Sequence, residues 1–385
     1  MTTKRAIIVG AGIAGLAAAL RLHRGGWATL VLERAPARRS SGYMVNLLGG
    51  GYDAAERLGL VPALQARDLG VFTSILTRAD GSPKFTVPAA VVEAAVGDRA
   101  LSLFRGDLET VLFEAAAADI RFATTLRAID TDPDGVTVTL SDGATERADL
   151  LIAADGLHSA TREAVFGPEA DHLVEMGHMV GALPLHRVPT GLAEGSGSTY
   201  IGPGRTAAVV NLGPGRSSAF FTYRTADAAA DLERGSVASL TSAFGDLGGG
   251  VPDALDQLAA APETAYFDSV SQIVTDSWSR GRVVLLGDAA WCVTLFAGFG
   301  AALALSGADE LGAALQRHPD VPTALADWEA RLRPEVRKRQ ALAKRGMLQF
   351  APPTKAHIWM NDLTMRAIQL PGLRALVQRS IRAAR

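Results

Sequence analysis

Three glycines and one acidic residue near the start of the chain have the spacing of a dinucleotide-binding site. Gly10, Gly12 and Gly15 follow directly on the apolar run at residues 6–9, and Glu33 stands 18 residues beyond Gly15. Such glycines permit a tight turn, close approach of backbone N–H groups to a pyrophosphate, and close packing of helix on strand. The acid binds a ribose 2′-hydroxyl and repels a 2′-phosphate, so this stretch predicts FAD or NAD and disfavours NADP there. The alternative is a glycine-rich turn without a ligand.

The elements around this loop must hold it at the end of a buried strand. Residues 4–9 and 29–34 have the apolar, β-branched character of strands buried on both faces. The alanine- and leucine-rich residues 16–24 predict a helix whose positive end faces the phosphate. Arg34 stands close enough to that site to neutralise a phosphate. A solvated basic loop is the alternative for the two arginines at residues 38–39.

Two further strand ends carry acidic residues. Asp155 and Asp288 each follow an apolar, strand-like run and begin a turn. Gly298 and Gly300 form a second glycine-punctuated turn, which leads into an apolar helix at residues 301–314. The strand that ends at Glu33 and the two strands that end at Asp155 and Asp288 make three strand-to-acid junctions in one chain.

Strands with turn signals occupy the rest of the first two thirds of the chain. Residues 71–87 predict a hairpin, and residues 120–150 predict a meander with Asp-Gly turns. Residues 176–224 contain several strand-like runs separated by glycine and proline, as in a largely antiparallel sheet, and residues 226–262 return to helix. The fold class expected is α/β, or α+β overall, with a Rossmann-like domain interleaved with a mostly antiparallel sheet domain and followed by C-terminal helices.

Composition excludes several classes of protein. The chain has 385 residues, 48% of them hydrophobic, so it is long enough for a large core. A net charge of −2 without a basic block argues against nucleic acid, and no apolar run is long enough to span a membrane. The chain enters its first strand at once, which leaves no room for a signal peptide, and the single cysteine, Cys292, fits a cytoplasmic protein. We expect no metal site, and a monomer or homodimer.

The three junctions, in this order and at this spacing, resemble the group A flavoprotein monooxygenases, the FAD-dependent aromatic hydroxylases typified by para-hydroxybenzoate hydroxylase. The resemblance covers nearly the whole chain. The segments Ser41-Gly42-Tyr43 and Arg105-Gly106-Asp107-Leu108 further resemble short members that modify polyketides and antibiotics such as tetracyclines.

The resemblance implies a role for each junction. The glycine turn, Ala14 included, would hold the FAD pyrophosphate, with Glu33 on the adenosine ribose and Arg105 near the ribityl–phosphate region. Asp155 would be a contact shared by FAD and NAD(P)H, and Asp288 would bind the ribityl chain. The cofactor-binding residues expected are Gly10, Gly12, Ala14, Gly15, Glu33, Arg34, Arg105, Asp155, Asp288, Gly298, Gly300 and Ala301.

The flavin end of the predicted site departs from the family. Trp291 stands where histidine is usual, Leu295 where proline is usual, and Phe299 where glutamine or a small polar residue is usual. The turn before residue 301 and the positive end of the following helix would still face the flavin N1–C2=O edge and stabilise the anionic reduced flavin. We expect Trp291, Leu295, Phe299 and His178 in the substrate pocket.

The resemblance also divides the chain into domains. An FAD-binding domain would take residues 1–70, 100–170 and 275–345, and a substrate-binding sheet domain residues 71–99 and 171–274. Residues 346–385 would form C-terminal helices.

The activity implied is that of an FAD-dependent monooxygenase. NADH or NADPH would reduce FAD, O₂ would form a flavin C4a-hydroperoxide, and one oxygen would pass to an apolar, polycyclic or aromatic natural-product-like small molecule. No side chain stands out as a catalytic base, and His158 is expected only to satisfy backbone groups in its turn. The departures leave room for an FAD-bound non-redox cyclase, and a non-catalytic flavin-binding regulator is the second alternative.

Overall fold

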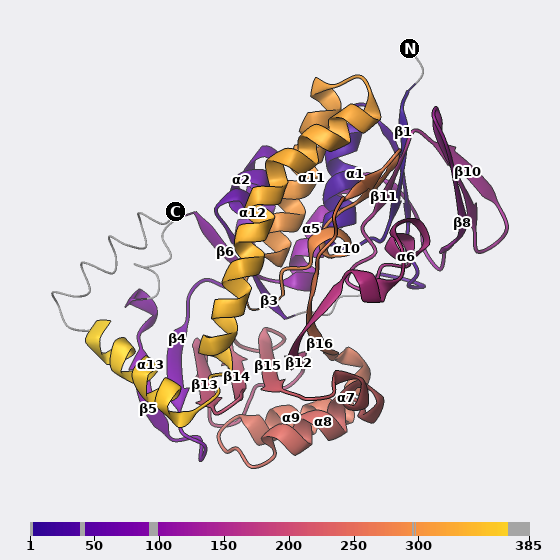
Figure 1. Ribbon diagram of the computed structural model, residues 1–385. Coiled ribbons are helices and arrows are strands. Elements are labelled where there is room, and N and C mark those ends of the chain that lie inside the picture. The colour runs from indigo at the N-terminus through magenta and orange to yellow at the C-terminus, as the bar shows by residue number, and fades with distance from the viewer. Residues whose placement is uncertain (1–2, 39–42, 92–98, 295, 297, 369–385) are drawn as a thin grey trace.

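The computed structural model describes residues 3–38, 43–91, 99–294, 296 and 298–368. Two large sheets make up the body of the described chain, and the long helix α12 (Val321–Phe350) extends from beside the first sheet towards the second (Figure 1). The predicted mixed α/β class is confirmed. No helix among the described residues has both the length and the apolar character needed to cross a membrane.

The first sheet is parallel apart from one edge strand. Its order is β17-β18-β11-β1-β2-β7. The bounds are Ser279–Arg280 for β17, Val283–Leu285 for β18, Leu150–Ala153 for β11, Arg5–Val9 for β1, Ala28–Leu32 for β2 and Asp119–Arg121 for β7. The chain winds outward from β1 in both directions, so the strand order reverses between β1 and β11. Open α/β sheets bind ligands at that point, beyond the carboxyl ends of the strands.

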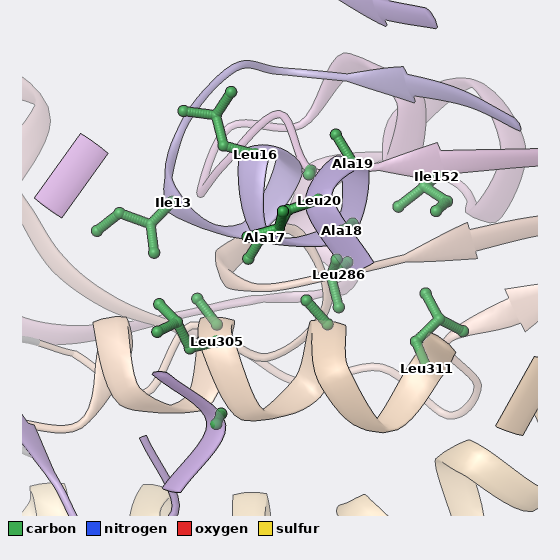
Figure 2. Packing of buried hydrophobic residues seen from close by; sticks show 14 of the residues in the cluster. Ile13, Leu16, Ala17, Ala18, Ala19, Leu20, Ile152, Leu286, Leu305 and Leu311 are labelled. Atoms are coloured by element: carbon green, nitrogen blue, oxygen red, sulfur yellow. The ribbon is translucent and has the colours of Figure 1, made fainter. Parts of the chain in front are cut away.

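Helices cover this sheet and carry the largest apolar core. Helix α1 (Ile13–Arg24) lies between the sheet and α11 (Gly300–Arg317), and α5 (Arg105–Ala116) packs on its other side. Figure 2 shows side chains of α1 and α11 gathered with Ile152 of β11 and Leu286, which directly follows β18. Alanines fill much of α1, which brings its backbone close to both neighbours. Helices α2 (Gly50–Arg57) and α3 (Val61–Gln65) extend the same layer.

The second sheet has the order β16-β12-β15-β14-β13-β4-β5 and is antiparallel except where β13 meets β4. The bounds are Tyr266–Ile273 for β16, Leu173–Leu185 for β12, Ser217–Arg224 for β15, Arg205–Asn211 for β14, Ser196–Gly202 for β13, Thr73–Thr77 for β4 and Pro83–Val87 for β5. Three helices cover one face with a separate apolar core: α7 (Ala228–Arg234), α8 (Ser236–Phe244) and α9 (Val251–Ala260) (Figure 1).

Smaller elements complete the described chain. The predicted meander forms a three-stranded sheet of β8 (Leu126–Asp132), β9 (Gly135–Leu140) and β10 (Thr145–Ala148). Strands β3 (Met44–Leu48) and β6 (Ala100–Phe104) pair beside the first sheet. The remaining elements are the helices α6 (Ala160–Phe166), α10 (Asp288–Trp291) and α13 (Lys355–Ile368), and the 3₁₀ turns η1 (Glu169–Asp171) and η2 (Pro262–Thr264).

Helix α12 runs through the boundary expected between residues 345 and 346. The side chain of Gln340 on this helix donates to the Ile273 carbonyl at 2.8 Å, and the backbone carbonyl of Gln340 accepts from the side chain of Gln272 at 3.0 Å. The helix is therefore tied to the end of β16 in the second sheet. Residues 369–385, the end of the segment expected to form C-terminal helices, lie outside the described residues, and the division into domains stays a prediction.

We expect Gly15→Ala to destabilise the protein by about 3 kcal/mol or more. A Cβ at Gly15 would lie 1.9 Å from the Gly10 carbonyl oxygen, a backbone atom that cannot move aside without opening the glycine loop. Denaturant unfolding measures the change. Gly50→Ala is the matched control, because a Cβ there meets nothing within 4 Å; it should stay within about 0.5 kcal/mol of the parent. Equal stability of the two variants would contradict the packing argument.

Candidate functional site

Three strand ends meet at the glycine loop. A Cβ at Gly10, whose φ is +100°, would lie 2.4 Å from the carbonyl oxygen of Ala154 at the end of β11. A Cβ at Gly287, at the end of β18, would lie 2.8 Å from the Cβ of Ala14. The structure thus brings together all three strand-to-acid junctions that the sequence singled out, at the point where the strand order reverses.

The loop leaves the first turn of α1 open to an anion. Gly12 precedes the helix without a side-chain cap, and no acidic residue stands in the first turn. Uncapped N–H groups and the positive helix end favour a phosphate there. Glu33 fixes the loop, since its carboxylate accepts the N–H of Ala11 at 2.8 Å and the N–H of Ala35 at 2.7 Å. Each carboxylate oxygen keeps a second lone pair, so these bonds leave Glu33 able to accept a ribose hydroxyl. Arg34 is exposed.

An arginine and a buried carboxylate lie against Gly12. Arg105, at the start of α5, places Nη2 2.7 Å from Oε1 of Glu109 one turn later. Both side chains approach within 4 Å of the Cβ position of Gly12. Burial raises the pKa of Glu109, and Arg105 opposes the rise. Burial works to lower the pKa of Arg105, but nearby anions, Glu109 first, leave it above its ordinary value.

The carboxylate of Asp155 is engaged by its own turn. One oxygen accepts the Ser159 hydroxyl at 2.5 Å, and the other accepts the N–H of Thr161 at 3.0 Å and its hydroxyl at 2.8 Å. Ser159 in turn caps α6. Asp155 therefore shapes the loop after β11, and a contact with FAD or NAD(P)H stays a prediction.

One cavity of about 520 Å³ joins the glycine loop to the second sheet. Its volume lies within the range of small-molecule sites. Gly12, Ala14, Arg105 and Asp288 line one end, together with Gly298, Gly300 and Ala301. The opposite end has apolar walls, formed by Val180, Phe220, Val270, Phe296 and Phe350.

Burial shifts the pKa values of four ionisable groups that line the cavity, Asp288 at the loop end and Tyr43, Tyr266 and Cys292 further along, towards their neutral forms. Asp288 opens onto the cavity but is otherwise enclosed, and burial raises the pKa of its carboxyl against the pull of Arg105. Burial raises the pKa of Tyr43 to about 12 and holds those of Tyr266 and Cys292 well above their ordinary values. The two tyrosine rings lie 5.8 Å apart. Tyr43, Tyr266 and Cys292 therefore offer neutral hydroxyl and thiol donors rather than anions.

Hydroxyl groups interrupt the apolar end. Ser269 and Ser271 lie on one face of β16 and share a hydrogen bond of 2.9 Å. Thr294 also lines the cavity with a φ of +75°, which is uncommon for a β-branched residue, and its buried hydroxyl has no partner among the described residues. A buried hydroxyl without a partner costs about 1–3 kcal/mol, so a ligand that supplied one would gain from it.

The start of α11 is likewise open. Gly298 has a φ of +66° and lines the cavity, and a Cβ at Gly300 would meet nothing within 4 Å. No side chain caps the helix, and its first turn has no acidic residue. Two uncapped helix ends, glycine backbone and the Arg105 guanidinium therefore surround one elongated cavity. These donors fit an extended dinucleotide such as FAD.

The substrate-pocket candidates need correction. Trp291 is 1% exposed and does not line the cavity; its ring lies 4.6 Å from Trp278 and 5.7 Å from Trp328 in the core. Phe299 lies beneath the guanidinium of Arg339 at 3.7 Å, also outside the lining. The Trp291 ring gains more from the closed core than from a cavity open to water, which the local sequence did not reveal.

His178 is buried behind the cavity wall rather than in it. Its Nδ1 lies 2.7 Å from the Met176 carbonyl oxygen, its ring meets Phe296 edge-on at 6.1 Å, and burial lowers its pKa. Its Nε2 is buried without a partner among the described residues. Leu295 lies outside the described residues.

His158 bridges two parts of the chain, contrary to the expectation that it satisfies its own turn. Its Nδ1 lies 3.0 Å from Glu169 and its Nε2 3.2 Å from Asp268 on β16. The places of Glu109, Tyr266 and Asp268 in the site were not apparent from the sequence. Only Glu109 carried a signal, its position four residues after Arg105 on one helix.

Comparison with known proteins places this site in context. The family described as FAD binding domain matches residues 3–320. An uncharacterized protein of Mycobacterium tuberculosis is 30% identical over 357 residues, which cover 91% of this chain and 95% of that protein. A flavin-dependent monooxygenase from an unknown prokaryotic organism is 28% identical over 345 residues, 88% of each chain. The crystal structure of tetracycline destructase Tet(55) is similar with a TM-score of 0.80 and 25% identity, covering 95% and 96% of the two chains.

The His158 contacts predict a pH-dependent contribution to stability. Asp268 and then Glu169 raise the pKa of His158 from 6.5 to about 9 against the effect of burial. Because the pKa of His158 is higher in the folded than in the unfolded protein, its protonated form stabilises the folded state. This contribution is fully present below pH 6.5 and is lost as the pH rises through about 9. The difference in unfolding free energy between the parent and His158→Gln should therefore be larger at pH 6 than at pH 10. Since the side chain is 53% exposed, we expect less than about 1 kcal/mol. A difference that grew with pH would contradict this assignment.

Proposed function

Since the chain belongs to the FAD binding domain family and is an FAD-dependent monooxygenase, we propose that NADH or NADPH reduces its FAD and that a neutral, apolar, aromatic or polycyclic compound is its substrate. The observation that carries the proposal is the cavity of about 520 Å³ that leads from the glycine loop to the second sheet. One end suits the cofactor and the other suits an apolar ring system.

Each end of the cavity has residues suited to one part of FAD. The N–H groups that start α1 would bind the pyrophosphate, Glu33 the adenosine ribose, and Arg105 the region between phosphate and ribityl chain. Asp288 would accept ribityl hydroxyls, and the open start of α11 would favour negative charge on the flavin ring. When bound, FAD accepts a hydride from the nicotinamide and activates O₂ so that one oxygen atom reaches the substrate.

The stoichiometry defines what the protein must supply. Substrate–H, O₂, NAD(P)H and one proton give substrate–OH, water and NAD(P)⁺. The chain's own part is to exclude water, to orient the substrate on the apolar walls, and to deliver that proton. The neutral tyrosine, serine and threonine hydroxyls of the cavity are suited to orienting an oxygen substituent of the substrate.

The walls also favour a neutral substrate. Arg105 is the one cationic side chain among the described cavity-lining residues, and Glu109 already pairs with it at 2.7 Å. A carboxylate on the substrate would be buried against apolar side chains without a partner, at considerable cost. The structural relative named a tetracycline destructase acts, by that name, on tetracyclines, which supports a polycyclic compound.

A reduction assay tests the proposed activity. The purified protein should show a flavin spectrum that NADH or NADPH bleaches without air, and a suitable substrate should increase oxygen uptake in air. The heat-unfolded protein with added FAD is the control for free flavin. A bound flavin that neither nucleotide reduces would contradict the proposal and favour the non-redox cyclase. A protein that takes up no FAD would contradict the cofactor itself.

A matched ligand series tests the substrate class. Naphthalene, 2-naphthol and 2-naphthoate present the same ring system with no polar group, a neutral hydroxyl and a carboxylate. Titration of the FAD-loaded protein, followed through its flavin absorbance, should give the tightest binding for 2-naphthol. We expect 2-naphthoate to bind about tenfold more weakly or worse, because its charge gains no partner. Tightest binding by 2-naphthoate would reject the neutral class.

A further inference from the structure

A continuous path of polar side chains leads from the cavity to the protein surface. Tyr266 lines the cavity at the start of β16 and is 37% exposed, and its hydroxyl donates to Oδ2 of Asp268 at 3.3 Å. The same oxygen lies 3.2 Å from Nε2 of His158, whose side chain is 53% exposed. Asp268 itself is 13% exposed. The carboxylate is thus shielded, with a cavity group on one side and a surface group on the other.

The surroundings of this path hold each member in place. The other oxygen of Asp268 accepts the N–H of Ser269 at 2.7 Å, which leaves Oδ2 for Tyr266 and His158. The second ring nitrogen of His158 lies 3.0 Å from Glu169 on η1. The remaining oxygen of Glu169 accepts from Arg162, a fully buried guanidinium, at 2.8 Å.

On the cavity side, Tyr266 faces the other ionisable groups already described. The ring of Tyr43 lies 5.8 Å away, and the electrostatic neighbours of the Tyr266 hydroxyl include Cys292 and Asp288. Among the described residues, no other carboxylate is shared between a side chain in this part of the cavity and an exposed histidine.

We propose that His158, Asp268 and Tyr266 form a proton relay between solvent and the cavity. The inference rests on the proposed function in one respect: a monooxygenase turnover takes up one proton, which must reach a cavity whose substrate end has largely apolar walls. Chains of hydrogen bonds of the Tyr–Asp–His kind polarise one another and move protons without free ions.

The transfer balances at every atom. The Tyr266 hydroxyl gives its proton to an acceptor in the cavity, and a proton from Asp268 replaces it. Asp268 takes that proton from Nε2 of His158, and water reprotonates the imidazole at the surface. One O–H or N–H bond forms for each one that breaks, so the net change is one proton moved inward. The reverse sequence moves a proton outward.

If His158 only held two segments together, its contacts with the two carboxylates would be enough, and the bond from Tyr266 would not be needed. Two carboxylates around the imidazole already join the turn after β11 to β16, since both pairs are within 3.2 Å. The Tyr266 hydroxyl adds nothing to that junction, yet it extends the path into the cavity. Two carboxylates also keep His158 charged at neutral pH, because they raise its pKa to about 9, so it is a ready donor.

The single cysteine offers a test inside the cavity. Cys292 lines the cavity and is the one cysteine of the 385-residue chain, so 2-chloromercuri-4-nitrophenol attaches a pH indicator there and nowhere else. A stopped-flow pH jump on the labelled, FAD-loaded protein then reports how fast a proton reaches the cavity. We expect His158→Gln, Asp268→Asn and Tyr266→Phe each to slow this relaxation about tenfold or more, with the same final absorbance.

Two variants control the experiment. His318→Gln breaks a histidine–aspartate pair of the same 3.2 Å length with Asp327 outside the cavity lining, and Tyr43→Phe removes a cavity hydroxyl outside the path. Both should keep the parental rate within about twofold. Added imidazole should restore the rate of His158→Ala, which a merely structural role would not explain.

The possible results separate the relay from the proposed function. Parental rates in all three path variants would overturn the relay, as would an equal slowing in Tyr43→Phe. The measurement needs neither a nicotinamide nor a substrate. A protein whose flavin no nicotinamide reduces would therefore overturn the proposed function and leave the relay to be judged on its own rates.

Discussion

The approach of three strand ends to one glycine loop is the constraint on which the rest of the structure depends. Gly10 lies against the carbonyl of Ala154, Gly15 against the carbonyl of Gly10, and Gly287 against Ala14, all at distances that exclude a Cβ. With no side chains between them, the backbones of the three strand ends pack directly against one another, beside the uncapped start of α1. The cavity, its charged end and the position of both helix starts follow from this contact.

The cavity beside the glycine loop changes character along its length. Charge is confined to the end near the loop, where Arg105 and Glu109 neutralise each other. Beyond it, burial holds Tyr43, Tyr266 and Cys292 neutral, and the far walls are apolar. A site of this kind stabilises charge on a cofactor at one end and disfavours charge on a substrate at the other. The contrast comes from how well each end solvates a charge, not from any single contact.

The features that could be predicted from the sequence are those that depend on residues close together in the chain. The glycine loop, Glu33 and the strand-to-acid junctions each depend on a few neighbouring residues, so they and the fold class were accessible from the sequence. Tyr266 and Asp268 were not, because their place depends on the register of β16 against β12, where Asp268 stands opposite Val180 across a bulged pairing. Nothing in the local sequence specifies a register between strands some 90 residues apart.

Trp291 shows how a departure from a family pattern can belong to the core and not to the chemistry. Its ring packs between Trp278 and Trp328, and a Cβ at Gly307 on α11 would lie 2.9 Å from it. The helix therefore gives up a side chain to admit the ring, and the indole N–H of Trp328 donates to that glycine's carbonyl at 2.9 Å. The core therefore accommodates the Trp291 ring, which takes no space from the cavity. It consequently gives no support to a non-redox cyclase, whose case in the sequence depended on this position and two others nearby.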